Sequence, residues 1–221
     1  MNKVFIVIPA YNEKKAITSI IAKLLNLNYS NIVVVDDGSV QPVSHHIAAY
    51  PVHIITHNIN LGQGAALRTG TEYALQQAAD IIVHFDADGQ HQAEEIRDLL
   101  HVLSEGYGAA LGSRYLHERQ DVPLSKKYFI HKPAIYFNWL FTGLKLTDAH
   151  NGFRALTRDA AQKILIEQNR MAHGTEIIAE IKKHNIKYKE VPVKITYTEY
   201  GQNFRGGIKV ITDLIKQKIL S

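Results

Sequence analysis

Residues 4–39 read VFIVIPAYNEKKAITSIIAKLLNLNYSNIVVVDDGS, and this stretch determines which fold we expect. Short β-branched runs stand near its two ends, at Val4–Ile8 and Ile32–Val35, and their composition is typical of buried strands. The segment between them places four apolar residues on one helical face: Ile17, Ile20, Ile21 and Leu24. A strand, a helix and a second strand in this order predict a βαβ unit with parallel strands.

The same alternation continues to about residue 115. Apolar runs predict further strands at His53–Thr56, Ile81–Phe85 and Ala109–Leu111, with helices at 64–79 and 94–104 between them. Continuous apolar strands separated by helices indicate an α/β fold, with a mostly parallel central sheet and helices on both faces. Ligands of such sheets bind beyond the carboxyl ends of the strands. The residues of most interest are therefore those that follow the strands: Pro9–Glu13, Asp36–Ser39, Asp86–Gln90 and Gly112–Tyr115.

The second half of the chain has a looser pattern. We expect a polar loop at 116–127, an apolar helix at 135–141 and a terminal amphipathic helix at 207–220. Between these helices the sequence predicts a strand at 153–156, helices at 159–168 and 175–184, and an alternating edge strand at 189–196. With 221 residues, 46% of them hydrophobic, the chain is expected to form one domain.

Composition and charge exclude several classes of function. The net charge of +4 suits anionic ligands or an anionic membrane surface, but the basic residues are scattered, so we expect no nucleic-acid partner. The chain has no cysteine, which excludes disulfides and thiolate metal sites. The run Val4–Ile8 is too short for a signal peptide, and no run is long enough to span a membrane. We expect a cytoplasmic protein whose closest approach to lipid is peripheral contact with the inner face of the membrane.

Asp86 and Asp88 form the motif with the clearest chemistry. They follow the apolar strand Ile81–Phe85, which directs two carboxylates to the edge of the sheet. Hard cations such as Mg²⁺ or Mn²⁺ prefer oxygen ligands and commonly combine one or two carboxylates with substrate phosphates. Gln90 offers a further oxygen, whereas His91 is expected to be solvated. Because Asp and Gly also favour solvated turns, this segment alone leaves a metal site and a turn as equal alternatives.

The other polar motifs also have two interpretations each. Asp36–Ser39 either contacts a ribose or base, or caps the next helix, and Tyr11 can stack on a base. Gly62 and Gly64 open a helix and can admit a phosphate, but Leu67 stands where a dinucleotide-binding fingerprint needs its third glycine. Three arginines stand beside small or glycine residues and can either clamp phosphate or form surface ion pairs: Arg114, Arg154 and Arg205.

Taken together, six motifs in this order resemble family 2 glycosyltransferases, and most closely the branch that transfers sugars to dolichyl and polyprenyl phosphates. The motifs are Pro9–Glu13, Asp36–Ser39, Asn60–Gly64, Asp86–His91, Gly112–Tyr115 and Asn151–Arg154. The resemblance covers nearly the whole chain. It implies the nucleotide-sugar transferase fold called GT-A, with residues 1–115 binding the nucleotide sugar and 116–221 forming the acceptor half. It also implies inverting transfer from a nucleoside-diphosphate sugar, with Mg²⁺ or Mn²⁺, to a polyprenyl phosphate or a cell-surface glycan precursor.

The resemblance assigns residues to this chemistry. The nucleotide site is expected to contain Pro9, Tyr11, Glu13, Asp37 and Asp86, to which the glycine pattern adds Gly64. The metal and diphosphate are assigned to Asp86, Asp88 and Gln90, and the acceptor or its phosphate to Arg114, Arg154 and Arg205. A hydroxyl acceptor would need a base, for which Asp148 and Glu176 are the candidates. A lipid acceptor would be reached by peripheral docking or through a membrane protein partner.

Two other classes of protein remain as alternatives. Haloacid-dehalogenase-type phosphatases also carry Asp-x-Asp-Gly after an apolar strand, although they expect Thr or Val where this chain has Gln90. The other alternative is a non-catalytic subunit that binds a sugar nucleotide and docks on a membrane partner through 135–141 and the terminal helix. Amphipathic stretches of this kind more often pack in the core or between the two copies of a homodimer.

Overall fold

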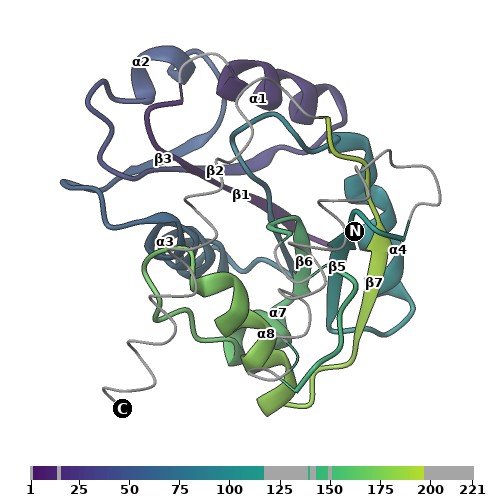
Figure 1. Cartoon of the computed structure of the whole chain (residues 1–221). Helices are drawn as coiled ribbons and strands as arrows, with labels where there is room; N and C mark the ends of the chain where they lie inside the picture. Colours follow the sequence, from purple (N-terminus) through teal and green to yellow (C-terminus); the bar gives the residue numbers. More distant parts are fainter. Residues whose placement is uncertain (1, 14–15, 117–138, 140–142, 149–150, 197–221) are drawn as a thin grey trace, which may run out of the picture.

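A seven-stranded sheet forms the centre of the molecule in the computed structural model, which describes residues 2–13, 16–116, 139, 143–148 and 151–196 (Figure 1). The strands are β1 (Val4–Ala10), β2 (Asn31–Asp36), β3 (His53–Thr56), β4 (Ile81–His84), β5 (Ala109–Ser113), β6 (Arg154–Thr157) and β7 (Tyr188–Pro192). Their order is β3-β2-β1-β4-β6-β5-β7. Only β6 runs antiparallel to its neighbours β4 and β5, so the predicted mostly parallel sheet is confirmed for the described residues.

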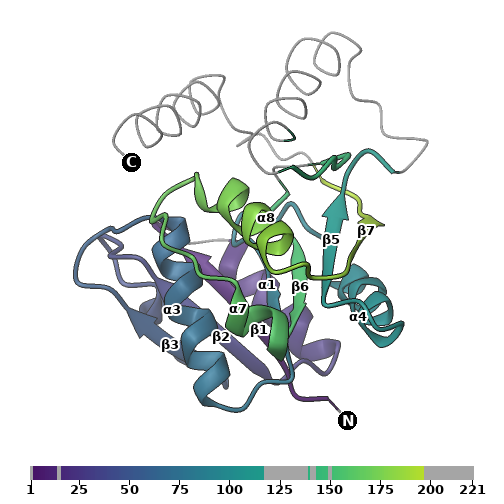
Figure 2. The same cartoon turned by 90° about the horizontal axis from the view of Figure 1, so that it is seen from below.

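Helices cover both faces of the sheet (Figures 1 and 2). One face carries α1 (Ala16–Asn26), α2 (Ser44–Ile47) and α4 (Ile96–Ser104), the last preceded by a 3₁₀ turn at Ala93–Glu95. The other face carries α3 (Gln63–Gln76), α7 (Arg158–Lys163) and α8 (His173–Lys183). The α/β class with helices on both faces is therefore confirmed.

The apolar run of β1 is continuous because the strand is buried on both faces. Ile6 and Ile8 pack into the cluster on the α1 side, whereas Phe5 and Val7 pack into the cluster on the α3 side. The helical face predicted for α1 is also as expected, since its buried residues are Ile17, Ile20, Ile21 and Leu24. The opening βαβ unit is thus the middle of the sheet and the centre of both cores.

The chain departs from the predicted elements in the second half and at one short helix. The helix expected at 159–168 ends at Lys163, because Ile164 and Ile166 are both buried while Leu165 is exposed, an alternation that requires extended backbone. The short helix α2 was not predicted. The helices expected at 135–141 and 207–220, and Arg205, lie outside the described residues, except that Trp139 is described.

The topology brings several polar segments to one edge of the sheet. Strands β1, β2, β4 and β5 share one direction, so their carboxyl ends meet at this edge, which we call the rim. Strand β6 runs the other way and therefore begins at the rim, with residues 151–153 just before it. Both predicted halves of the chain thus contribute to the rim. Among the helices of the described residues, none combines the length and the hydropathy that a membrane-spanning segment needs.

Candidate active site

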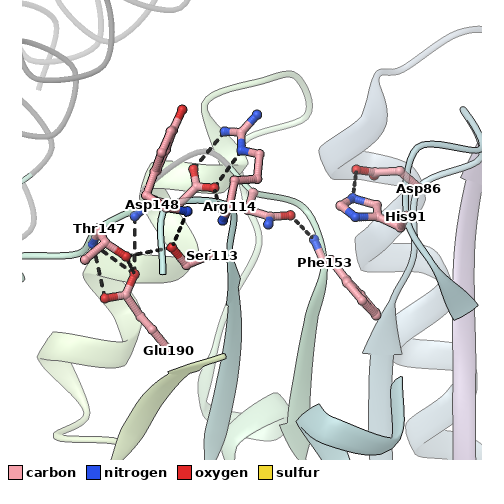
Figure 3. Close-up of polar contacts among 10 residues, drawn as sticks. Asp86, His91, Ser113, Arg114, Thr147, Asp148, Phe153 and Glu190 are labelled. Atoms are coloured by element: carbon pink, nitrogen blue, oxygen red, sulfur yellow. Dashed lines mark hydrogen bonds and ion pairs between the residues drawn. The ribbon is translucent and has the colours of Figure 1, made fainter. Parts of the chain in front are cut away.

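Asp86 is held at the rim by its neighbours on three sides. Gln63 Nε2 donates to Asp86 Oδ1 at 2.7 Å. His91 Nε2 lies 3.3 Å from Asp86 Oδ2, as Figure 3 shows. A Cβ atom added to Gly152 would overlap the Asp86 carboxylate, so only glycine admits the side chain there. Burial raises the pKa of Asp86, but the hydrogen bond and charge of His91, with the charge of Arg154, bring the pKa below its usual value. Asp86 is therefore a fixed, ionised carboxylate.

Asp88 is the exposed member of the pair. One of its oxygens accepts the backbone N–H of Gln90 at 3.0 Å. Desolvation and the negative charge of Asp86 raise the pKa of Asp88, and desolvation together with the charge of Asp88 raises the pKa of Glu13. Three carboxylates thus gather at the rim and repel one another. A bound cation would relieve this repulsion.

Asp86 and Asp88 suit a cation whose coordination is completed by oxygens of a bound ligand. Among residues 2–13, 16–116, 139, 143–148 and 151–196, no group of three or more His, Cys, Asp or Glu side chains is arranged to hold a metal. Asp86 and Asp88 would therefore provide one or two oxygens, and a diphosphate would complete the coordination, as is usual for Mg²⁺. The donor set fits a hard divalent cation.

His91 was expected to be solvated, and this expectation is wrong. The ring is buried and packs against Phe85 and Phe153, with ring centroids 5.9 and 4.9 Å away. A single β-bridge joins His91 to Ile195, and Thr196 N donates to Gln90 O at 3.0 Å. The segment that follows β7 therefore covers His91 and fixes the backbone after Asp88.

The Asp36–Ser39 segment orders the loops of the rim. Asp36 is buried and accepts the backbone N–H groups of Ser39 and Val43. The buried carboxylate of Asp37 accepts four hydrogen bonds, from His57 Nδ1, Asn60 Nδ2, Leu61 N and Gly62 N, at 2.7 to 3.0 Å. The loop at 57–62 is thus held by Asp37, and the nucleoside contact assigned to this residue stays a prediction.

The residues after β1 lie beside this loop. Pro9 is within β1, and Tyr11 beyond it is 48% exposed. Asn12 adopts a left-handed backbone and ties the two loops together, because its N–H donates to Ser39 Oγ and its Oδ1 accepts Val40 N. The exposed ring of Tyr11 is available to a ligand, and its contact with a base stays a prediction.

Gly62 and Gly64 allow the chain to approach itself closely. A Cβ atom on Gly64 would overlap the carbonyl oxygen of Gln168, and one on Gly62 would overlap that of Asn169. Ala65 N donates to the same Asn169 oxygen at 3.1 Å. The space beside these glycines is thus filled by the 168–169 backbone, and the contact of Gly64 with a nucleotide stays a prediction.

Arg154 lies in a buried polar layer behind Asp86. The side chain is only 4% exposed, and its Nε donates to Gly152 O at 3.2 Å. Burial lowers the pKa of Arg154 to about 10, against the opposing charge of Asp86. The surface ion pair considered for Arg154 is therefore wrong. Its charge faces Asp86 from within the protein, and its contact with a phosphate stays a prediction.

Two neutral histidines share this layer. Burial, followed by the charge of Arg154, lowers the pKa of His173 to about 4. Burial lowers the pKa of His84 well below its usual value, and the ring is bonded through Nε2 to Thr71 Oγ1 at 3.0 Å. Arg154 is thus accompanied by uncharged rings, and Asp86 is the nearby acid that balances it.

Arg114 and Asp148 form a second polar group at the rim (Figure 3). Arg114 Nε and Nη2 lie 2.6 and 2.7 Å from Asp148 Oδ2 and Oδ1, and the Arg114 backbone N–H also donates to Oδ2 at 3.1 Å. Asp148 is buried, whereas the Arg114 side chain is 21% exposed. Both oxygens of this candidate base are therefore bonded to Arg114.

Glu176, the other candidate base, lies in the first turn of α8. Its Oε2 accepts the backbone N–H groups of Glu167 and Gln168, both at 3.0 Å. Burial raises the pKa of Glu176, against these two hydrogen bonds. In the structure this carboxylate holds the 167–168 backbone, which in turn packs against Gly64. A role as base stays a prediction for both Asp148 and Glu176.

Sequence reasoning missed Glu190, which lies in β7 next to the Arg114 group. Its carboxylate accepts hydrogen bonds from Thr147 and from the backbone of Asp148 (Figure 3). An acidic residue in an alternating edge strand is ordinary, so nothing in the sequence pattern distinguishes it. The one available signal was its pairing position, because a strand placed beside β5 brings residue 190 close to the residues that precede Arg114.

A hollow of about 350 Å³ lies at the opposite end of the strands, bordered by Gly108, Thr157 and Lys187. Its other charged groups have partners, since Lys163 pairs with Asp159 at 2.7 Å and His184 with Glu180 at 3.2 Å. It contains none of the predicted site residues, and we place the candidate active site at the rim.

Comparison with known proteins identifies the family that the chain resembles over most of its length. A protein-family model described as glycosyl transferase family 2 matches residues 5–165. An uncharacterised protein of Methanocaldococcus jannaschii is 40% identical, over 99% of this chain and 93% of the relative. A UDP-N-acetylglucosamine–dolichyl-phosphate N-acetylglucosaminyltransferase of Methanococcus voltae is 32% identical, over 98% of this chain and 96% of that enzyme.

Solved structures show the same fold. The glucosyl-3-phosphoglycerate synthase of Mycobacterium tuberculosis, in a crystal structure with Mg²⁺ and uridine diphosphate, matches with a TM-score of 0.74 and 16% identity. The match covers 97% of this chain and 79% of that enzyme. At this identity the likeness shows the fold alone, which is the predicted GT-A type.

Proposed function

Because the chain belongs to glycosyl transferase family 2, we propose that it transfers a sugar from a nucleoside-diphosphate sugar to a polyprenyl phosphate, with inversion and with Mg²⁺ or Mn²⁺. Membership of this family excludes the phosphatase alternative. The acceptor class is supported by the 32% identical relative, whose name specifies dolichyl phosphate, and that name also makes UDP-N-acetylglucosamine the first donor to test.

The observation that carries the proposal is the different environment of Asp86 and Asp88 at the end of β4. Asp86 is fixed by Gln63 and His91, whereas Asp88 is exposed and has one oxygen bonded to backbone. A fixed and an accessible carboxylate would together hold a divalent cation that also binds the diphosphate. The bound cation would neutralise charge on the leaving diphosphate. Metal in the glucosyl-3-phosphoglycerate synthase structures supports this choice of cofactor.

The hydrogen bonds of the candidate bases favour a phosphate acceptor over a hydroxyl. Asp148 is bonded to Arg114 through both oxygens, and Glu176 is bonded to backbone N–H groups. A phosphate oxygen is already anionic and needs no base, whereas a hydroxyl does. In the proposed reaction that oxygen forms a bond to the anomeric carbon, and the bond to the diphosphate breaks with its electron pair on the diphosphate. Arg114 would attract the anionic acceptor.

The proposal is tested by following labelled sugar from UDP-N-acetylglucosamine into polyprenyl phosphate in detergent micelles, with Mn²⁺ or with a chelator. We expect label in the lipid fraction only when the metal is present. Asp88→Asn should lower transfer by about 100-fold or more, because the carboxylate that faces the diphosphate has lost its charge. The matched control is Asp98→Asn, which changes an exposed carboxylate on α4 and should leave the rate unchanged.

Three outcomes would contradict parts of the proposal. Near-normal metal-dependent transfer by Asp88→Asn would remove the role assigned to Asp88. Transfer to a sugar hydroxyl but to no polyprenyl phosphate would replace the acceptor class with a glycan precursor. Binding of nucleotide sugars without transfer to any acceptor would support the non-catalytic subunit instead, and a thermal-shift titration detects such binding.

A further inference from the structure

Glu190 gathers hydrogen bonds from a segment that is distant in sequence. Thr147 N donates to its two carboxylate oxygens at 2.9 and 3.1 Å, and Thr147 Oγ1 donates at 2.8 Å. Asp148 N is 3.2 Å from Oε1. These donors lie 42 and 43 residues earlier in the chain, so the carboxylate fixes a segment that has no strand of its own. Hydrogen bonds to a charged acceptor are about twice as strong as neutral ones.

The contacts continue from this segment to Arg114. Thr147 Oγ1 also bonds to Ser113 Oγ at 2.6 Å, and Asp148 holds the Arg114 guanidinium in a two-point contact. Strands β5 and β7 are parallel, with Leu111 opposite Glu190, so the carboxylate reaches across from the neighbouring strand. Figure 3 shows the group in one view, with Glu190 and Arg114 on opposite sides of the 147–148 segment.

We propose that Glu190 is a positioning residue for the acceptor: by fixing residues 147–148, it makes Asp148 hold the Arg114 guanidinium where the acceptor phosphate binds. This inference rests on the proposed function for the identity of the acceptor. The guanidinium is planar and has a fixed set of N–H directions, so its orientation decides which phosphate oxygens it can meet. Asp148 sets that orientation only if its own backbone is fixed, and Glu190 is the side chain that fixes it.

Glu190→Gln is the informative substitution because it keeps the shape of the side chain. The amide has one acceptor oxygen where the carboxylate had two, and its NH₂ group would face donors of Thr147. We expect the KM for polyprenyl phosphate to rise about tenfold, which is the effect of weakening one charged hydrogen bond. The KM for the sugar nucleotide and kcat should stay within about twofold. Glu105→Gln, which changes an exposed carboxylate paired with Lys189 of the same strand, is the matched control.

A double-mutant cycle tests whether the effect passes through Arg114. Arg114→Lys keeps the charge but loses the two-point contact with Asp148. In that background Glu190→Gln should raise the acceptor KM by less than about twofold, because the geometry it supports is already lost. Full additivity of the two substitutions would overturn the inference. If Glu190→Gln fails to fold, Thr147→Val removes only one donor and should raise the acceptor KM about threefold.

A readout that needs no transfer separates this inference from the proposed function. Phenylglyoxal modifies accessible arginines, and peptide mass spectrometry gives the rate at Arg114 itself. We expect this rate to rise several-fold in Glu190→Gln and to stay unchanged in Glu105→Gln. If the wild type transfers no sugar to any polyprenyl phosphate, the proposed function fails while this rate still tests the link from Glu190 to Arg114. An unchanged rate overturns the link, and a raised rate with an unchanged acceptor KM overturns its role in acceptor binding.

Discussion

At the scale of single residues, the Asp86 carboxylate lies directly against Gly152 at the rim. A methyl group at position 152 would occupy the space of the Asp86 carboxylate, which Gln63 and His91 prevent from moving freely. We expect Gly152→Ala to lower sugar transfer by about tenfold or more and to cost about 1–3 kcal/mol in the free energy of unfolding. Transfer assays and urea denaturation of the same preparation measure the two effects.

The control for this substitution is Gly174→Ala. Gly174 lies in α8, and a methyl group there would meet no atom within 4 Å. Alanine in a helix is favoured over glycine by about 0.5–1 kcal/mol, so this variant should be slightly more stable and fully active. If Gly152→Ala behaves like Gly174→Ala, the Asp86 carboxylate is not confined as the structure indicates.

The site residues differ in how far the sequence could reveal them. Asp86 and Asp88 could be found because they end a buried strand, and the direction of parallel strands places such residues at the rim. The burial of His91 could not be predicted, because it depends on a bridge to Ile195, more than a hundred residues away. Glu190 is hidden for a similar reason, since its importance comes from which segment it meets. A local sequence pattern indicates what chemistry a residue can perform, but it does not indicate which distant residues the side chain contacts.

At the scale of elements, Gly70 of α3 packs directly against the centre of the sheet. A methyl group on Gly70 would overlap Val7 of β1 and press against Val35 of β2. We expect Gly70→Ala to lower the free energy of unfolding by about 1–3 kcal/mol, because the helix must move away from two packed strands. The midpoint of urea denaturation measures this, and Gly174→Ala again supplies the same chemical change in open space. Equal midpoints for the two variants would show that α3 has room to move.

The elements of the second half were harder to predict than those of the first. Strand β6 was expected at almost the observed residues. A short apolar run contains no information on strand direction, however, and the antiparallel direction of β6 is seen only in its pairing with β4 and β5. Similarly, residues 164–166 have a composition that a helix tolerates. Their backbone is extended instead, because this places both Ile164 and Ile166 in the core on the α3 side of the sheet. Tertiary contacts decide the outcome in both places, the strand direction in the first and the extended backbone in the second.

At the scale of the whole molecule, the second half of the chain completes a sheet that the first half begins. Strand β6 lies between β4 and β5, so the segment before β6 meets Asp86, while the segment after β7 meets His91. Asp86 and the backbone that follows Asp88 therefore depend on contacts from both halves. A mostly buried layer of Arg154, His84 and His173 supports them from behind, and it gives the entire fold a dependence on pH.

The sign of that dependence follows from His173. Its pKa is about 4 in the folded protein and near 6.5 when the residue is unperturbed. Above pH 6.5 the ring is neutral in both states and contributes no pH dependence. Between pH 6.5 and 4 the unfolded chain binds a proton that the folded protein does not, so the free energy of unfolding falls as the pH falls. Below pH 4 both states bind it, and the total loss from this group is about 3–3.5 kcal/mol.

His173→Asn tests this origin of the pH dependence. Asparagine can still donate to Arg170 O, as the imidazole Nδ1 does at 2.7 Å, but it does not titrate. Urea denaturation at pH 7, 6, 5 and 4.5 should show a smaller loss of stability for this variant than for the wild type, whatever its stability at pH 7. The exposed His46 of α2 provides the control, because His46→Asn should leave the slope unchanged. Parallel pH profiles for His173→Asn and the wild type would mean that the loss of stability in acid arises at other groups.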